Sequence, residues 1–287
     1  MLISTSNDRF SRRFGPIEAT KRLIDAGFTA LDCSMMILGS FPFTDDYRET
    51  AKEMRRIADE RGVPFNQAHA PFGGYSEYLS DIVPLFEKAF ETASILGIPV
   101  IVVHPTQYKD YHEDPEGIYK FNVKFYRSLI PLSKRYGVKI AIENMWSRDS
   151  KTGDIIDAIL SSPEEMKRMY DELADSDAFT VCLDIGHLAL TGKDLTESIK
   201  LLGKERLGAL HVHDVVKNRD LHTMPGLGIV DWESVEKALA DIGYEGELTL
   251  EADGYYDTMS DDEVQAAAQA LAAKAKEITS HIEAYKI

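Results

Sequence analysis

The chain has 287 residues, of which 44% are apolar and 28% are charged, a balance typical of globular proteins. Its 48 Asp and Glu outnumber its 32 Lys and Arg, and the resulting net charge of -16 disfavours binding to nucleic acid or to anionic membranes. No apolar run reaches the ~20 residues that span a bilayer. Residues 1–8 lack the pattern of a secretory signal, and the two cysteines, Cys33 and Cys182, are too few for a disulfide framework. We therefore expect a cytoplasmic protein.

Short apolar runs rich in Val, Ile and Thr predict eight β-strands along the chain. The runs 98–104 and 138–143 are nearly continuous in apolar residues, as expected of strands that are covered on both faces. In chain order, the predicted strands begin near Leu2, Phe28, Pro64, Ile98, Val138, Phe179, Leu207 and Glu247.

Segments of helical period fill the gaps between these strands. The first four span residues 16–26, 45–61, 81–96 and 115–136, and each precedes a glycine that can end a helix. The later helices are predicted to begin near Pro163, Asp194, Asp231 and Asp261.

Eight β-then-α units predict an α/β protein, a (β/α)8 TIM barrel that forms a single domain over residues 1–287. The length supports this, because such barrels have ~250 residues. A doubly wound open sheet is the alternative, but it would usually show a Gly-rich first turn, which residues 5–8 do not supply.

Ionisable side chains gather where the predicted strands end. Five of the eight histidines lie at strand ends or in the loop that follows, whereas His112 and His281 are expected on the solvated surface. In a barrel, the strand ends converge on one mouth. The candidate residues are His69, His104, Glu143, Asp184, His187, His211, Asp220, His222 and Glu251.

Any one of these residues is as readily a hydrogen-bonded structural group as a ligand, but the whole set would be costly to bury without a compensating charge. A divalent cation supplies that charge. Glu143, Asp184, His211 and Glu251 form a carboxylate-rich set suited to one Mn²⁺, Co²⁺ or Mg²⁺, and further imidazoles would favour Zn²⁺. His213 lies two residues after His211 on the same strand face, and we assign it a supporting hydrogen-bonding role.

At these motifs the sequence resembles the xylose isomerase-like TIM-barrel superfamily, which includes sugar-phosphate isomerases and epimerases, ketose 3-epimerases and zinc apurinic endonucleases of the endonuclease IV type. The resemblance covers nearly the whole chain. The motifs that carry it are residues 141–144, 183–187, 210–214, 220–232 and 250–251.

The resemblance implies two different metal sites. In the epimerase branch, one metal would be held by Glu143, Asp184, His211 and Glu251, the two glutamates would act as acid and base, and His187 would contact substrate. In the endonuclease branch, all nine candidate residues would hold three zinc ions. Family members are often dimers or tetramers, which leaves a homo-oligomer open.

We weigh three hypotheses. The first is a metal-dependent isomerase or epimerase of a ketose or related small sugar, phosphorylated or not, that moves a proton through an enediolate. Substrate contacts are then assigned to His187, His69, His213, Trp146 and Arg148. The second is a trinuclear zinc phosphodiesterase, for which we find no basic loops that could follow a DNA backbone. The third is a non-catalytic binding barrel with a structural metal.

Overall fold

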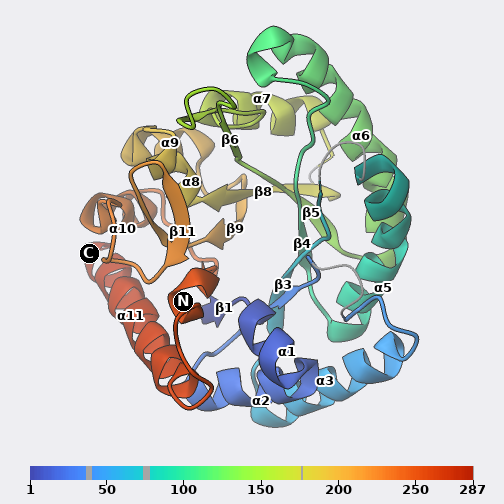
Figure 1. Ribbon diagram of the computed structural model, residues 1–287, viewed down its shortest axis with the longest axis vertical. Coiled ribbons are helices and arrows are strands. Elements are labelled where there is room, and N and C mark those ends of the chain that lie inside the picture. The colour runs from blue at the N-terminus through green and yellow to red at the C-terminus, as the bar shows by residue number, and fades with distance from the viewer. Residues whose placement is uncertain (37–40, 74–77, 176, 287) are drawn as a thin grey trace.

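Eight parallel strands form the centre of the molecule in a computed structural model, which describes residues 1–36, 41–73, 78–175 and 177–286 (Figure 1). Each strand begins within three residues of its predicted start. The strands are β1 (Ile3–Thr5), β2 (Leu31–Ser34), β3 (Phe65–His69), β4 (Val100–Val103), β5 (Lys139–Glu143), β8 (Phe179–Asp184), β9 (Leu207–His211) and β12 (Leu248–Leu250).

The strands close into a barrel. Six of them form one parallel sheet in the order β2-β3-β4-β5-β8-β9, and β1 pairs in parallel with β12. Parallel bridges between Ser6 and Asp32 and between Val212 and Leu250 join these two sheets. The predicted (β/α)8 barrel is therefore confirmed, and Figure 1 shows its helices as a ring around the strands.

Apolar side chains pack on both faces of the strands. On β4, Ile101 and Val103 face the large core beneath the helices, whereas Val100 and Val102 join the smaller cluster that includes Cys182. This alternation is the period of two of a strand that is covered on both faces. Both cysteines are buried and free. Among the described helices, none has both the length and the apolar sequence that a transmembrane segment requires.

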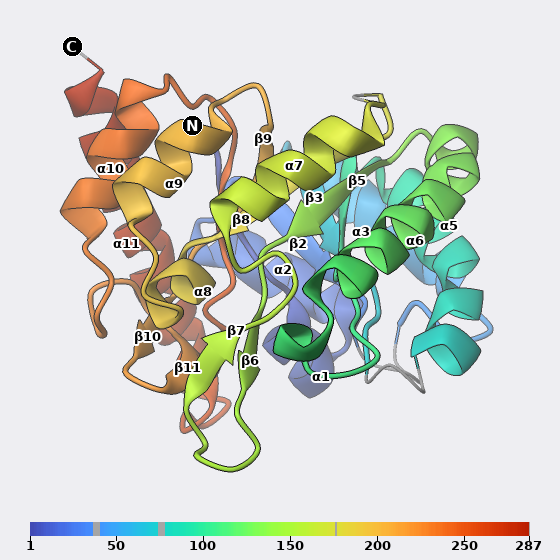
Figure 2. The same cartoon turned by 90° about the horizontal axis from the view of Figure 1, so that it is seen from above.

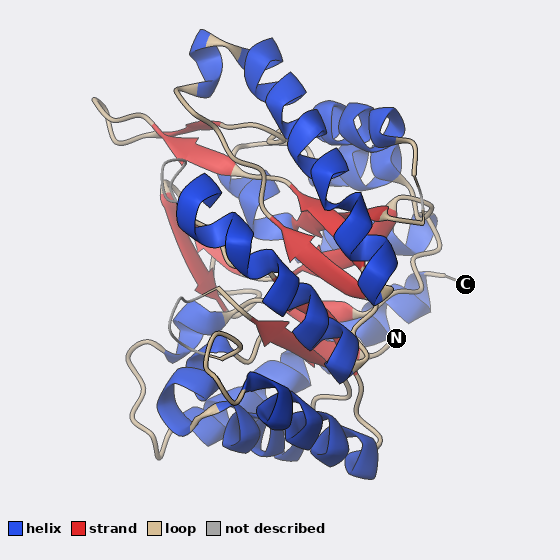
Figure 3. Cartoon of the chain, turned by 90° about the vertical axis from the view of Figure 1, so that its right-hand side faces the viewer, coloured by secondary structure: helices blue, strands red, loops and turns tan. Residues whose placement is uncertain are grey.

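The outer helices follow the predicted order, with blue helices outside red strands in Figure 3. The expected segments 16–26 and 115–136 are helical over their full length, and Ser162, Asp194 and Asp231 cap the helices that follow them. The helices are α2 (Pro16–Ala26), α3 (Tyr47–Arg61), α5 (Phe86–Leu96), α6 (Pro115–Tyr136), α7 (Pro163–Leu173), α9 (Leu195–Leu202), α10 (Trp232–Asp241) and α11 (Val264–Tyr285).

The segment predicted as one helix over 81–96 is the clearest difference. It begins as a π-helical turn, η1 (Tyr78–Ile82), and a 3₁₀ turn, η2 (Val83–Leu85), before α5 starts at Phe86. Pro84 explains the break, because proline has no backbone N–H and its ring clashes with the carbonyl four residues earlier.

Several short elements at the C-terminal ends of the strands were not predicted, and Figure 2 shows α1 and both hairpins on one side of the barrel. The hairpins pair β6 with β7 and β10 with β11, both antiparallel. These elements build the rim of the barrel mouth. They are α1 (Asp8–Phe14), η3 (Tyr111–Glu113), β6 (Trp146–Arg148), β7 (Ile155–Asp157), α8 (Ile185–Leu190), β10 (Asp214–Val216), β11 (Arg219–Thr223) and η4 (Asp253–Tyr256).

Candidate active site at the barrel mouth

The predicted ligand-type residues do converge. His69, Glu143, Asp184 and His211 are the last residues of β3, β5, β8 and β9, and Glu251 directly follows β12. All five side chains are buried. Because the carboxyl ends of parallel strands meet at one end of a barrel, the fold brings together groups that lie up to 182 residues apart in sequence (69 to 251).

Glu143, Asp184, His211 and Glu251 form the first cluster, in which potential ligand atoms all lie within 4.8 Å of one another. Nδ1 of His211 lies 2.6 Å from Glu143 Oε1, 3.3 Å from Glu251 Oε2 and 3.9 Å from Asp184 Oδ2. Three buried carboxylates thus surround one imidazole. This donor set fits a divalent cation, because a single imidazolium cannot balance three negative charges.

Glu143 also belongs to a second cluster, with His69 and His104. Nε2 of His104 lies 2.8 Å from Glu143 Oε2 and 2.9 Å from His69 Nε2. Burial would raise the pKa of Glu143, but His211 and His104 outweigh it and hold that pKa well below its usual value. The glutamate is therefore an anion at neutral pH, and it is shared between two clusters.

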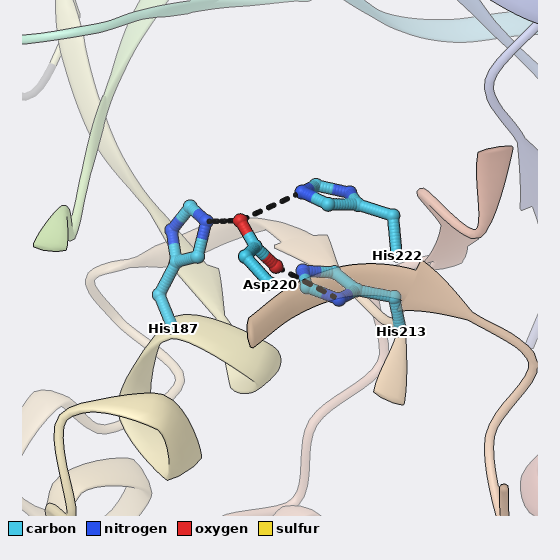
Figure 4. Close-up of side chains that lie close together, drawn as sticks. All are labelled: His187, His213, Asp220 and His222. Atoms are coloured by element: carbon cyan, nitrogen blue, oxygen red, sulfur yellow. Dashed lines mark hydrogen bonds and ion pairs between the residues drawn. The ribbon is translucent and has the colours of Figure 1, made fainter. Parts of the chain in front are cut away.

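His187, His213, Asp220 and His222 form a third cluster (Figure 4). Asp220 Oδ2 lies 3.3 Å from His187 Nε2 and 3.0 Å from His222 Nε2. Trp146 donates its indole N–H to the same oxygen at 3.0 Å. The two unpredicted hairpins therefore position this cluster. β11 carries Asp220 and His222, and β6 carries Trp146, which orients Asp220.

A cavity of about 430 Å³ opens above these clusters, within the ~300–1,000 Å³ range of small-molecule sites. His69, His104, Glu143, His187 and Glu251 all line it, and so does Trp146. The substrate contacts assigned to Trp146, His187 and His69 remain predictions, and these side chains lie where such contacts require them.

Two other residues assigned to substrate lie elsewhere. His213 is fully buried and does not line the cavity, and its Nε2 lies 3.0 Å from Asp184 Oδ2. Arg148 is also absent from the lining; it donates to the carbonyls of Gly153 and Asn218 and lies over the Trp146 ring. Both side chains contact other protein groups in the structure, and the direct substrate contacts assigned to them stay predictions.

One charged wall of the cavity was missed by sequence reasoning. Arg9 pairs with Asp257 at 2.7 Å and Arg12 pairs with Asp8 at 2.7 Å, and all four residues line the cavity. The signal was present in the sequence, because Asn7-Asp8 follows the end of the first strand and can start a helix.

Asp253 lies on this wall, and its burial, together with the nearby Asp8, raises its pKa to about 7 from 3.8. Between pH 3.8 and about pH 7, Asp253 keeps its proton in the folded state but has lost it in the unfolded state. The contribution of this group to the free energy of unfolding therefore falls as the pH rises over that range. We expect Asp253→Asn to remove this slope in chelator-treated protein, raising Tm by several degrees at pH 8 and little at pH 4. Thermal denaturation at both pH values checks this, with Asp257→Asn on the exposed rim as control. An equal Tm change at both pH values would contradict it.

The closed barrel defines the chain as a TIM-barrel protein. The C-terminal end of its strands carries clusters of His, Asp and Glu that could hold metal ions. It belongs to the xylose isomerase-like TIM barrel family, whose model matches residues 21–276. The resemblance noted from the sequence is thereby confirmed.

Curated relatives of this family have different activities. The putative L-ribulose-5-phosphate 3-epimerase SgbU of Escherichia coli is 28% identical over 189 residues, which cover 63% of this chain and 61% of that protein. A probable endonuclease 4 of Acholeplasma laidlawii is 23% identical over 212 residues, covering 67% of this chain and 69% of that protein. The match thus spans about two thirds of each relative's length.

Solved structures share the complete fold. A D-tagatose 3-epimerase-like protein has a TM-score of 0.74 at 20% identity, covering 99% of this chain and 98% of its own. The IolI protein, solved with a bound zinc atom, has a TM-score of 0.73 at 18% identity and covers 99% of both chains. At these identities the likeness establishes the fold alone.

Proposed function

We propose that this protein is a metal-dependent isomerase or epimerase of a ketose or related small sugar. The observation that carries the proposal is the first cluster, in which Glu143 and Glu251 approach the same nitrogen of His211, at 2.6 and 3.3 Å, beneath a cavity of small-molecule size. Two carboxylates beside one candidate metal site could supply the base and the acid that proton removal and return require.

A divalent cation held by Glu143, Asp184, His211 and Glu251 would act as a Lewis acid toward the oxygens of a bound ketose. Either glutamate removes the proton next to the carbonyl, and the other returns it after an enediolate has formed. Return to the opposite face inverts the carbon, whereas return to the neighbouring carbon isomerises the sugar. We assign to His187, which lines the cavity, the orientation of a substrate hydroxyl.

The charge of the cavity favours a polyhydroxylated substrate. The two arginines that line the cavity, Arg9 and Arg12, each pair with an aspartate. They can therefore donate hydrogen bonds to a substrate while adding little net positive charge. A net charge of -16 also disfavours a nucleic acid partner. The sugar epimerases among the relatives support the same class of substrate.

A second candidate is a trinuclear zinc phosphodiesterase, and the three neighbouring clusters favour it. All nine residues that the endonuclease branch would use lie in these clusters. Three cations would neutralise an attacked phosphate and activate a hydroxide. A small phosphodiester would avoid the electrostatic objection to DNA.

The test is proton exchange in D₂O. The purified protein is loaded with Mn²⁺ or Co²⁺ and incubated with a panel of ketoses, free and phosphorylated, and the carbons next to the carbonyl are followed by NMR. We expect solvent deuterium to enter one of these carbons. Turnover without label would refute the enediolate route. Hydrolysis of a phosphodiester probe, with no ketose labelled, would favour the second candidate.

A further inference from the structure

We infer that Arg9 binds the end of the substrate that lies farthest from the first cluster, and that its pairing with Asp257 selects an uncharged sugar over a phosphorylated one. The inference rests on the proposed isomerase or epimerase function, which leaves phosphorylation of the substrate open. It names the substrate class as an unphosphorylated ketose, and it assigns this choice to two residues outside the three clusters.

Arg9 lies across the barrel mouth from Glu143. The eight strands form a ring in which β1 and β5 are four strands apart, so they stand on opposite sides. Arg9 is on α1, which follows β1, whereas Glu143 is the last residue of β5. Both side chains line the cavity of about 430 Å³. We therefore expect a ketose held by its carbonyl end beside Glu143 to extend its other end toward Arg9.

Arg9 has hydrogen-bond donors that the protein leaves unused. Its Nη2 lies 2.7 Å from Asp257 Oδ1, and among the described residues its side chain has no other polar partner. A guanidinium carries five N–H donors in a planar fork, so one carboxylate oxygen leaves most of them free. Arg12 differs, because its Nε and Nη2 lie 3.0 and 2.7 Å from the two oxygens of Asp8. The Arg9 side chain is 32% exposed, which leaves it open to a substrate hydroxyl.

Asp257 cancels the positive charge that would attract a phosphate. This carboxylate is 54% exposed at the rim, beside any group that binds Arg9. A phosphate ester carries about two negative charges at neutral pH, so it would lie against a like charge, whereas a hydroxyl is neutral. The described lining also has no surplus of positive side-chain charge, because it contains two arginines against six carboxyl groups, those of Asp8, Glu143, Asp220, Glu251, Asp253 and Asp257.

The experiment measures the binding of sugar alcohols, which have no carbonyl and are not isomerised. Ribitol and ribitol 5-phosphate are titrated by calorimetry into the full-length protein as purified. In Asp257→Asn we expect ribitol 5-phosphate to bind about 10-fold more tightly than in the wild type, because the freed guanidinium makes a charge-assisted hydrogen bond. The affinity for ribitol should change less than ~3-fold, because a hydroxyl carries no charge.

Arg9→Gln completes the test. We expect this variant to bind both ligands about 3- to 10-fold more weakly, since each loses one hydrogen bond to the guanidinium. The double variant Arg9→Gln/Asp257→Asn should show none of the gain in phosphate affinity. Neither substitution should prevent folding, because both side chains lie at the rim and are partly exposed.

Asp59→Asn is the matched control. Asp59 is 58% exposed and lies 2.7 Å from Arg55 Nε on α3, away from the cavity, and its loss changes the net charge by the same amount. Equal gains in phosphate affinity in Asp59→Asn and Asp257→Asn would overturn the proposal. So would a greater loss of ribitol 5-phosphate than of ribitol in Arg9→Gln, or the absence of binding in every variant. Deuterium exchange decides the isomerase proposal separately, because neither sugar alcohol is turned over.

Discussion

Replacing Glu143 with Gln is expected to lower the rate of ketose isomerisation by at least ~10³-fold, within the range for a lost acid–base group, and to lower the bound metal content as well. Glu143 is 1% exposed and belongs to two clusters, with one oxygen 2.6 Å from His211 and the other 2.8 Å from His104. The amide keeps the shape of the side chain but loses its charge. Proton transfer and metal binding should therefore fail together.

The measurement is the steady-state rate and the metal content of the same preparation. Glu236→Gln is the matched control, because Glu236 on α10 is also a buried glutamate that pairs with a histidine, His281, but it lies outside the cavity. The control should keep both rate and metal. Equal losses in the two variants would mean that removing any buried carboxylate damages the fold, and the specific role of Glu143 would be withdrawn.

The strand order and the convergence of the ligands could be predicted because both follow from simple rules. A short apolar run such as 98–104, rich in β-branched residues and flanked by Gly97 and Pro105, is typical of a strand covered on both faces. Eight such strands that alternate with helices form either a closed barrel or an open sheet. A closed barrel places Glu143, His211 and Glu251 at one mouth. The glycine after Ala26 and the proline at 115 fixed the helix ends for similarly local reasons.

The rim could not be predicted, because its elements are short and their stability comes from tertiary contacts. α1 has only seven residues, too few to be stable without tertiary contacts, so the start signal at Asn7-Asp8 was not enough to distinguish it from a loop. The β10–β11 hairpin is likewise held from outside: the buried carboxylate of Asp214 accepts from the backbone of Gly226 and Val230 and from the indole of Trp232. The contacts of Arg148 could not be predicted for the same reason, since its partners Gly153 and Asn218 lie in the two hairpins that the sequence did not reveal.

Metal removal is expected to lower Tm by about 10 °C at neutral pH. A ligand present at ~1,000 times its Kd stabilises a fold by about 4 kcal/mol, and each kcal/mol shifts Tm by ~2–4 °C in a chain of 150–250 residues. The physical reason is the first cluster, where Glu143, Asp184 and Glu251 are buried side by side. Scanning calorimetry of chelated protein, with and without added Mn²⁺ or Zn²⁺, measures the shift.

The shift should also grow with pH. Burial alone would lower the pKa of His187, but Asp184 and Asp220 outweigh it and raise that pKa to about 10 from 6.5. In metal-free protein, the attraction between protonated His187 and these two aspartates stabilises the fold fully below about pH 6.5 and progressively less as pH rises toward 10. A cation needs the neutral ring, so protons compete with it less as pH rises. If an ion in the third cluster displaces the proton of His187, the Tm difference between metal-loaded and metal-free protein is expected to be larger at pH 9 than at pH 6. A difference that shrinks over this range would show that no ion meets His187.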